Sequence, residues 1–378
     1  MRELRERRGL SQQELARAAG VSRQTVSYVE TGVYLPSVAV AVRMARALGV
    51  TVEELFPLQE PQSAIEAVPG GQLPVGPAVP VAVARVGAQW VAYPLACTHA
   101  LGTGLAAADG VAVGALGEPA RVRVQLWNEV AALERTAVVA GCAPALGVWG
   151  RIAEGLRPGL RVLHRHANSE QALRLLASGQ VHVAGVHVCD WHTGECNLPV
   201  VRRLLAGRRA VVFSLGTWEE GLVVRPGNPL GLARPGDLGG GRGRVRLVNR
   251  EPGSGARALL EAALREAGIP PDAVAGFHGP PAHSHQEVAR AVALGAADAG
   301  VSSGAVAALF GLDFVPWRQV RYDLVVLAEH LDEAPVRELL ATLADRRVRR
   351  QLEAVGGYDT RCTGEVVART GPGWQAPA

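Results

Sequence analysis

The chain lacks lysine altogether, so all 39 of its basic side chains are arginines. Such a bias is typical of GC-rich coding, and the net charge of only +4 does not by itself require a nucleic-acid partner. Also absent is any uninterrupted apolar run of the roughly eighteen residues that a membrane span needs. The N-terminal stretch MRELRERRGLSQQEL carries charges where a signal peptide has an apolar core. We therefore expect a cytoplasmic protein without a membrane partner.

Cysteine is scarce, with five residues that are scattered and odd in number. This pattern predicts reduced thiols rather than a disulfide framework. With 378 residues the chain exceeds what one ordinary core accommodates, so we expect two or three domains. Its 48% hydrophobic and 20% charged residues are typical of globular proteins.

Residues 1–57 carry the clearest pattern, that of short helices. Ser11 followed by Glu14 is a capping-box pattern, and Gly20 permits a tight turn after the first of two helices. Ser22 then caps the second helix, which runs through Tyr28. Pro36 starts a further helical stretch. Apolar residues at helical spacing close a small core: Val40, Met44, Ala47, Leu48, Val52 and Leu55. These residues are predicted to form an all-α domain.

Over about residues 2–57 the motifs SQQELARAAGVS, VSYVETG, LPS and MARALGV resemble the lambda-repressor and Cro-like helix-turn-helix family, also called the xenobiotic-response-element family. The resemblance implies that the second helix enters the DNA major groove. It assigns Arg23, Gln24, Ser27 and Tyr28 to base edges and phosphates, and Gln12 and Ser22 to backbone phosphates. Eight arginines against six glutamates make one copy a weak binder, so we expect a homodimer on a two-fold operator. The alternative is an all-helical interaction module with the same core.

Residues 58–80 are rich in proline and glycine and are predicted to form a semi-flexible linker. The stretches VAVARVGAQWVAYPLA, GVAVGAL and RVRVQLW then predict a small β-rich unit over residues 81–134. No chemistry is assigned to this unit. Cys97 and His99 lie close together in it, but two ligands are too few to predict a metal site.

From residue 135 to 370, strand patterns alternate with helix patterns, which predicts parallel βαβ units. The run AVVFSLGTWEEGLVVRPGNP indicates two strands without an intervening helix, and hence a crossing into a second lobe. We expect lobe 1 at about residues 135–212 and 314–370, lobe 2 at about residues 213–313, and a flexible tail at residues 371–378. The predicted protein is multidomain, with a helix-turn-helix head, a β-rich middle unit and a two-lobed α/β domain.

The two-lobed region resembles the type-two periplasmic-binding-protein superfamily, in its cytoplasmic branch fused to helix-turn-helix domains and related to molybdate-binding proteins. The matching segments are AGCAPALG, GVHVCDWHTGECN, EEGLVVRPGNP, NREPGSGAR, SHQEVARAVALGAADAG and GLDFVPW. The resemblance implies a ligand-sensing domain for a small anion, with molybdate or tungstate favoured. Two departures bear on the ligand: Ala143 replaces an acidic residue that relatives often carry, and Ala256 replaces a frequent threonine.

A ligand in such a sheet sits beyond the carboxyl ends of the strands. The residues expected there are Gly141, Cys142, Ala143, Asn168, Ser169, His187, Arg250, Gly253, Ser254, Gly255, Arg257, His285 and Asp298. Backbone N–H groups and the hydroxyls of Ser169 and Ser254 would hold an oxyanion, with Arg257 supplying positive charge. Asp298 either orients Arg257 or Arg250, or caps a strand end. The alternative for the Gly-Ser-Gly loop is a turn that only permits close helix–sheet packing.

The sequence also contains residue types suited to a zinc site and to nucleophilic catalysis. The soft ligands His187, Cys189, His192, Glu195 and Cys196 suggest zinc, but no CxxC spacing occurs and alternate strand residues face opposite ways, so no metal is predicted. Cys142 or Cys189 with His285 as base lacks a third group for nucleophilic catalysis.

The resulting hypothesis is a non-enzymatic, cofactor-free transcription regulator that binds operator DNA and responds to a small anion. An organic acid, a nucleotide-like metabolite or a molybdopterin-related compound would fit the same donors. The alternatives are an enzyme or cofactor-handling protein of molybdenum metabolism with an autoregulatory DNA-binding head, and an interaction scaffold.

Overall fold

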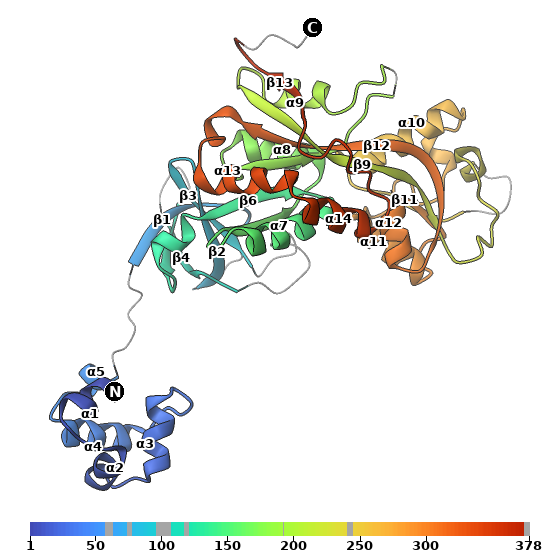
Figure 1. Cartoon of the computed structure of the whole chain (residues 1–378). Coiled ribbons are helices and arrows are strands. Elements are labelled where there is room, and N and C mark those ends of the chain that lie inside the picture. The colour runs from blue at the N-terminus through green and yellow to red at the C-terminus, as the bar shows by residue number, and fades with distance from the viewer. Residues whose placement is uncertain are drawn as a thin grey trace. The chain divides into compact units, whose positions relative to one another are not determined.

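The computed structural model describes residues 1–56, 63–73, 78–95, 107–116, 121–191, 193–239 and 245–373. The chain divides into two compact units, residues 1–62 and residues 63–378, which we describe separately (Figure 1). Cys97, His99 and His192 lie outside the described residues, as do residues 374–378 of the predicted tail. Among the described residues, no helix has the length and apolar character needed to cross a membrane.

The N-terminal unit is a cluster of helices, as the sequence predicts. Its elements are α1 (Arg2–Arg7), α2 (Gln12–Ala19), α3 (Arg23–Glu30), α4 (Val38–Leu48) and α5 (Val52–Leu55). The Ser11 hydroxyl accepts from the Glu14 N–H, and the Glu14 carboxylate accepts from the Ser11 N–H, so the predicted capping box is present. Gly20 follows α2 at φ 63° and turns the chain toward α3.

A buried ion pair fixes α3 within this unit. The Arg5 Nε lies 2.7 Å from Glu30 Oε1, and the Gln12 amide donates to Glu30 Oε2 at 2.8 Å. Arg5 also donates to the Leu10 carbonyl oxygen at 2.7 Å. One carboxylate at the end of α3 therefore ties α1 and α2 to it.

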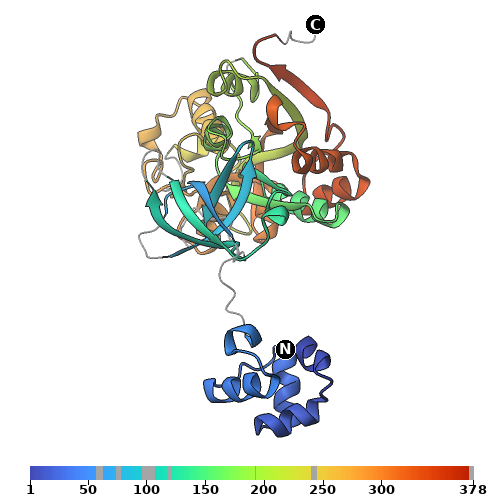
Figure 2. The same ribbon diagram turned by 90° about the vertical axis from the view of Figure 1, so that its left-hand side faces the viewer.

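Residues 63–126 contribute the strands of a closed barrel in the order β1-β3-β2-β4-β5 (Figure 2). The strands are β1 (Ser63–Pro69), β2 (Val79–Val86), β3 (Gln89–Pro94), β4 (Gly110–Leu116) and β5 (Arg121–Leu126). The prediction of a linker over residues 58–80 is wrong for β1, which pairs with both β3 and β5. The neighbouring prolines and glycines concealed its short alternating pattern. The short helix α6 (Val130–Leu133) adds Leu133 to the barrel core.

The rest of the chain is built on one sheet in the order β10-β11-β9-β12-β8-β6-β7, with β13 paired to β9. Its strands are β6 (Thr136–Gly141), β7 (Arg161–His166), β8 (Val183–Val186), β9 (Ala210–Val224), β10 (Leu247–Val248), β11 (Ala299–Ser303), β12 (Asp313–Leu327) and β13 (Val366–Thr370). The covering α-helices are α7 (Pro144–Leu156), α8 (Ser169–Ala177), α9 (Leu198–Leu204), α10 (Gly255–Glu266), α11 (His285–Ala293), α12 (Gly304–Leu309), α13 (Ala334–Ala341) and α14 (Arg346–Val355).

Two long strands carry the chain between the lobes. The sequence predicted two strands after residue 210, but the structure has a single strand there, β9. β9 runs antiparallel to β12, with Ala210 opposite Leu327 at one end and Val224 opposite Asp313 at the other (Figure 1). The sheet is therefore mixed rather than parallel, although β6 pairs in parallel with β7 and β8. Trp218 packs in the core of lobe 1 and Leu222 in the core of lobe 2, so the lobes meet near Glu220.

A buried aspartate anchors the barrel to lobe 1. Arg161 of β7 donates to both carboxylate oxygens of Asp109, at 2.5 and 2.6 Å. The Val83 N–H and the Asn128 amide donate to the same carboxylate at 2.7 and 2.8 Å. Barrel residue Tyr93 also packs in the apolar cluster that contains Leu173 of α8. The barrel is thus held by a charged contact inside an apolar interface.

We expect Asp109→Asn to lower the free energy of unfolding by about 3 kcal/mol, because it removes the charge that pairs with a largely covered guanidinium. Urea denaturation measures the change. The matched control is Glu134→Gln, which breaks the exposed Arg85–Glu134 pair nearby and should cost about 0–1 kcal/mol. Equal losses in the two variants would contradict the anchoring role.

Candidate functional site

The exposed face of α3 presents most of the residues assigned to DNA. Arg23, Gln24 and Tyr28 are exposed and Ser27 is half-buried. The Gln24 amide donates to the Tyr28 hydroxyl at 2.7 Å, so the two side chains form one polar surface. Ser22 caps α3 by accepting from the Thr25 N–H, and the Gln12 amide is bound to Glu30. Gln12 and Ser22 thus have structural partners within the unit.

Five polar residues meet at the boundary between the lobes, and we call them the interlobe cluster: Cys142, His187, Glu220, Arg250 and His285. Cys142 follows β6, His187 follows β8, Glu220 lies on β9, and His285 begins α11. Each is at most 2% exposed. Four of them were predicted from the sequence. Glu220 was not, because no motif distinguishes it from the exposed Glu219 beside it.

A chain of close contacts joins the cluster. Cys142 Sγ lies 3.4 Å from His187 Nδ1, and His187 Nε2 lies 3.0 Å from Glu220 Oε1. His285 Nε2 is 3.7 Å from the same carboxylate oxygen. Burial lowers the pKa of His187, but the opposing effects of Cys142 and Glu220 raise it to about 10. Burial, followed by the charge of Arg250, holds the pKa of His285 well below its usual value. The surroundings therefore shift the pKa values of the two imidazoles in opposite directions.

Arg250 supplies a second buried positive charge. Its Nε and Nη2 lie 2.7 and 3.0 Å from the carboxylate of Glu251, and its Nε also donates to the Ala282 carbonyl oxygen. Its Nη1 is buried without a hydrogen-bond partner. Burial lowers the pKa of Arg250, but Glu251, and then Cys142 and Glu220, raise it above its ordinary value. One guanidinium donor thus remains unsatisfied beside the cluster, which is costly unless something binds it.

Aromatic rings enclose the cluster on the lobe 1 side. The His187 ring centroid lies 5.2 Å from that of Trp218 and 5.6 Å from that of Tyr322. The Tyr322 hydroxyl packs on two glycines: a Cβ at Gly141 would lie 2.3 Å from it, and one at Gly185 2.2 Å. Gly141 is therefore required for close packing. Neither ring was predicted from the sequence, because Trp218 and Tyr322 become neighbours only through the pairing of β9 with β12.

The Gly-Ser-Gly loop packs against lobe 1. The Ser254 hydroxyl accepts from the Arg257 N–H and donates to the Glu251 carbonyl oxygen, and the Ser169 hydroxyl accepts from the His187 N–H. A Cβ at Gly255 would lie 1.8 Å from the His187 carbonyl oxygen. A Cβ at Gly253 would lie 3.3 Å from the Asn168 carboxamide oxygen. The Ser254 hydroxyl thus donates within its own loop in this conformation, and the close contacts of Gly253 and Gly255 agree with the packing alternative for the loop.

Two charged residues of the predicted site point elsewhere. Arg257 pairs with Glu261 at 2.8 Å and donates to the Arg250 carbonyl oxygen at 3.2 Å. Asp298 pairs with Arg246 at 2.8 Å and with Arg225 at 3.5 Å, so its predicted pairing with Arg250 or Arg257 is wrong. Asp298 also accepts from the Arg246 N–H at 3.0 Å, the strand-end role that the sequence left open. Ala143 is buried beside Cys142 as the N-cap of α7.

A disulfide closes the loop after His187. Cys189 and Cys196 are bonded, which corrects the prediction of reduced thiols for these two residues. An isolated β-bridge brings their Cα atoms within 3.9 Å, a proximity that sequence spacing does not reveal. Trp191 of this loop packs against the cores of both lobes. The loop therefore braces the lobe boundary, and its cysteines are not free to bind zinc.

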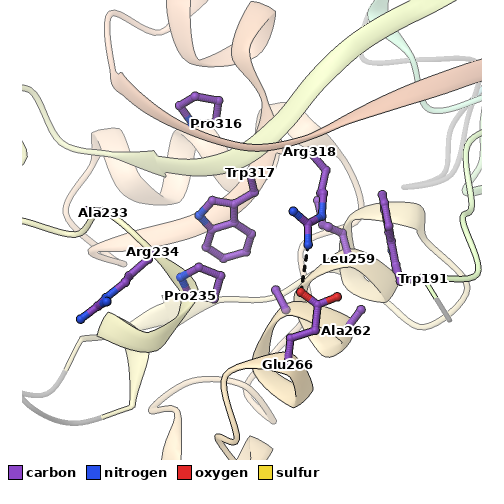
Figure 3. Close-up of a pocket in the computed structure, with 11 residues that line it drawn as sticks. Trp191, Ala233, Arg234, Pro235, Leu259, Ala262, Glu266, Pro316, Trp317 and Arg318 are labelled. Carbon is purple, nitrogen blue, oxygen red and sulfur yellow. Dashed lines mark hydrogen bonds and ion pairs between the residues drawn. The ribbon is translucent and has the colours of Figure 1, made fainter. Parts of the chain in front are cut away.

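Two cavities open near the lobe contact. One of about 370 Å³ is lined by lobe 1 residues, including His166, Asn168 and Arg174, and by Glu251 and His283. The His166 ring lies 2.6 Å from the His283 carbonyl oxygen at this opening. The other, of about 270 Å³, lies over α10, and Figure 3 shows the Arg318–Glu266 ion pair reaching across it. The first cavity borders Arg250 through its partner Glu251.

Comparisons with known proteins match both parts of the chain. The family described as PBP superfamily domain matches residues 151–344, and the helix-turn-helix family matches residues 1–55. The uncharacterized protein YvgK of Bacillus subtilis is 32% identical over 55% of this chain, which spans 66% of that protein, just under two thirds. The uncharacterized HTH-type transcriptional regulator YgzD of Bacillus subtilis is 42% identical over 16% of this chain and 91% of its own length.

Among solved structures, the sulfate-binding protein SubI of Mycobacterium tuberculosis aligns over 59% of this chain and 86% of its own, with a TM-score of 0.46 and 18% identity. The two family matches and the regulator YgzD confirm both resemblances inferred from the motifs at the level of the family. The chain belongs to the PBP superfamily and is a helix-turn-helix transcription regulator fused to a PBP-like ligand-binding domain.

Proposed function

We propose that this regulator acts as a homodimer on a two-fold operator and changes its operator affinity when a small anion binds between the lobes of its PBP-like domain. The observation that carries the proposal is Arg250, a buried guanidinium with an unsatisfied Nη1 at the lobe contact. Molybdate and tungstate, suggested by the family resemblance, are the first anions to try. Turnover is not part of this proposal.

The unsatisfied donor of Arg250 supports an anion as the ligand. His187 faces Glu220 and Arg250 faces Glu251, so these side chains are already paired, and the anion would be held by hydrogen-bond donors rather than by unpaired charge. A small anion would add hydrogen bonds to Arg250 Nη1 and, on rearrangement of the lobes, to the backbone N–H groups of the Gly-Ser-Gly loop. The cavity of about 370 Å³ suits a small ligand.

Ligand binding must favour one state of the dimer if it is to regulate. An anion that bound open and closed lobes equally would leave operator affinity unchanged, however tightly it bound. Typical coupling free energies are about 1–3 kcal/mol, equivalent to a change of roughly 5- to 150-fold in operator affinity. Gly255 of lobe 2 packs against the His187 carbonyl oxygen of lobe 1, so this contact joins the two lobes directly. The degree of lobe closure is therefore the property through which the anion would change operator affinity.

A second candidate is an enzyme or cofactor-handling protein of molybdenum metabolism with an autoregulatory DNA-binding head. The order Cys142, His187, Glu220 favours it, because a thiol, an imidazole and a carboxylate in contact form the usual arrangement for an activated nucleophile. Turnover of molybdate or a molybdopterin compound that Cys142→Ala abolishes, with binding retained, would decide for this candidate.

We expect Gln24→Ala to weaken operator binding by about 1–3 kcal/mol, because a glutamine on the groove-facing helix can read a base edge. An operator selected from random DNA with the full chain serves as the probe, and fluorescence anisotropy gives the affinity. Gln351→Ala, an exposed glutamine of α14, is the control. Equal affinities of wild type and Gln24→Ala would remove Gln24 from the interface.

We expect at least one of molybdate, tungstate, sulfate, phosphate or a simple organic acid to stabilise the PBP-like domain. At 100 times its dissociation constant, a ligand adds about 2.7 kcal/mol to the folded state, which a thermal melt detects. Arg250→Gln should abolish the shift, whereas Arg151→Gln, at a highly exposed arginine of α7, should retain it. No shift in the wild type with any of these anions would contradict the anion proposal.

We expect Gly255→Ala to uncouple the anion from operator affinity, since the added Cβ would lie 1.8 Å from the His187 carbonyl oxygen and force the lobes apart. Operator titrations with and without the stabilising anion measure the coupling. Gly155→Ala on α7 is the matched control, because a Cβ there meets nothing within 4 Å. Coupling that survives in Gly255→Ala would show that this closure contact is not needed.

A further inference from the structure

Three side chains of the interlobe cluster have the composition of a transition-metal site. One potential ligand atom from each of Cys142, His187 and His285 lies within 4.8 Å of the others, and all three residues are buried. These residues come from three separate segments, so their spacing in the sequence does not predict a metal site. The zinc ligands weighed in the sequence lay within residues 187–196, of which only His187 belongs to this group.

The spacing of the sulfur and the first imidazole suits a tetrahedral ion. Zinc binds sulfur at about 2.3 Å and histidine nitrogen at about 2.0–2.1 Å, so two such ligands stand about 3.6 Å apart. Cys142 Sγ and His187 Nδ1 are 3.4 Å apart. The third ligand atom, on His285, lies within 4.8 Å of the other two and would move inward to bind the same ion.

Neighbouring polar groups lie against the second nitrogen of both imidazoles. The Ser302 hydroxyl lies 3.2 Å from His285 Nδ1 and 3.3 Å from the His285 carbonyl oxygen. In the tautomer with the proton on Nδ1, an ion can bind the lone pair of Nε2, which is buried and has no hydrogen-bond partner. His187 Nε2 lies 3.0 Å from Glu220 Oε1, leaving Nδ1 to face the thiol. A metal-bound histidine characteristically has its other nitrogen held by such a neighbour.

The charge of a divalent ion fits this enclosed space. With Cys142 as thiolate and Glu220 ionised, the two negative charges balance an ion of charge +2 while both imidazoles are neutral. The nearby guanidinium of Arg250 is already paired with Glu251. No net charge is then left buried. Sulfur and imidazole together select soft or borderline ions such as Zn²⁺ over Mg²⁺ or Ca²⁺.

We propose that Cys142, His187 and His285 bind one transition-metal ion of the zinc class, held between the two lobes. Cys142 and His187 follow strands of lobe 1 and His285 begins a helix of lobe 2, so the ion ties the lobes together in their closed arrangement. Three protein ligands leave a fourth position for water or an anion. The inference deepens the proposed function, because it assigns a cation to the same cluster, and its test requires neither DNA nor an anion.

The test uses the full chain, stripped of metal with a chelator and kept without reductant so that the Cys189–Cys196 disulfide stays closed. Titration with Co²⁺ should give a thiolate-to-cobalt charge-transfer band that saturates at one ion per chain, and Zn²⁺ should displace it. Competition with a chromophoric chelator then gives the Zn²⁺ affinity. Absence of the thiolate band in the wild type overturns the proposal.

Variants identify the ligands. Cys142→Ser should abolish the band, and His285→Gln should weaken Zn²⁺ binding by more than the 10–100-fold that loss of an outer hydrogen-bond partner costs. Glu220→Gln should retain the band with Zn²⁺ bound about 10–100-fold more weakly. Cys362→Ser is the matched control, because Cys362 is the exposed free thiol among the described residues, and it should bind as the wild type does. A band that survives Cys142→Ser, or that disappears in Cys362→Ser, overturns the assignment.

Operator affinity is measured separately on the same samples. Metal binding without any change in operator affinity, with or without an anion, supports the metal site and contradicts the proposed regulation. An anion-dependent operator affinity in a protein that gives no thiolate–cobalt band supports the regulation and overturns the metal site. Melting curves of the variants show which of them are folded, and the wild-type stoichiometry stands independently of the variants.

Discussion

The antiparallel pairing of β9 with β12 is the constraint on which the PBP-like domain depends. Both strands are fifteen residues long, and each begins in the core of one lobe and ends in the core of the other. Every other element of the two lobes attaches to this ribbon directly or through its neighbours. Register shifts in β12 after Pro316 and after Tyr322 bracket the boundary between the lobes. Such irregularities bend a strand and increase its twist locally, so the ribbon is distorted at the lobe boundary.

The same pairing explains why charged groups can be buried at the lobe contact. Glu220 lies on β9, and the loops that carry Cys142, His187 and His285 converge on it. Inside a folded protein an unpaired polar atom is costly, and several atoms here lack partners, among them Arg250 Nη1 and His285 Nε2. Perturbed titratable groups gather at functional sites, which is why we propose the anion and the metal ion at this cluster.

Features that depend on residues close together in the sequence could be predicted, whereas features that depend on distant segments could not. The capping box at Ser11 and Glu14, the turn at Gly20 and the strand patterns of β6 and β8 are local, and their residues lie within a few positions of each other. Strand β1, the single strand β9 and the disulfide were mispredicted, because each depends on a partner segment that periodicity does not identify. Most residues of the candidate site were identified from motifs. Glu220 was missed although it lies in the motif EEGLVVRPGNP, because nothing there separates it from Glu219. Trp218 and Tyr322 were missed because their contacts depend on strand pairing.

The sequence by itself determined that the chain has a helix-turn-helix head and a two-lobed α/β region, because short-range periodicity, caps and family motifs are written in neighbouring residues. Only the tertiary structure decided which polar groups share a space. It directs Arg257 to Glu261 and Asp298 to Arg246, and brings Cys142, His187 and His285 from distant segments to one point. The physical reason is that burial and pairing are properties of three-dimensional packing. Within the sheet, the register of the strands decides which side chains become neighbours.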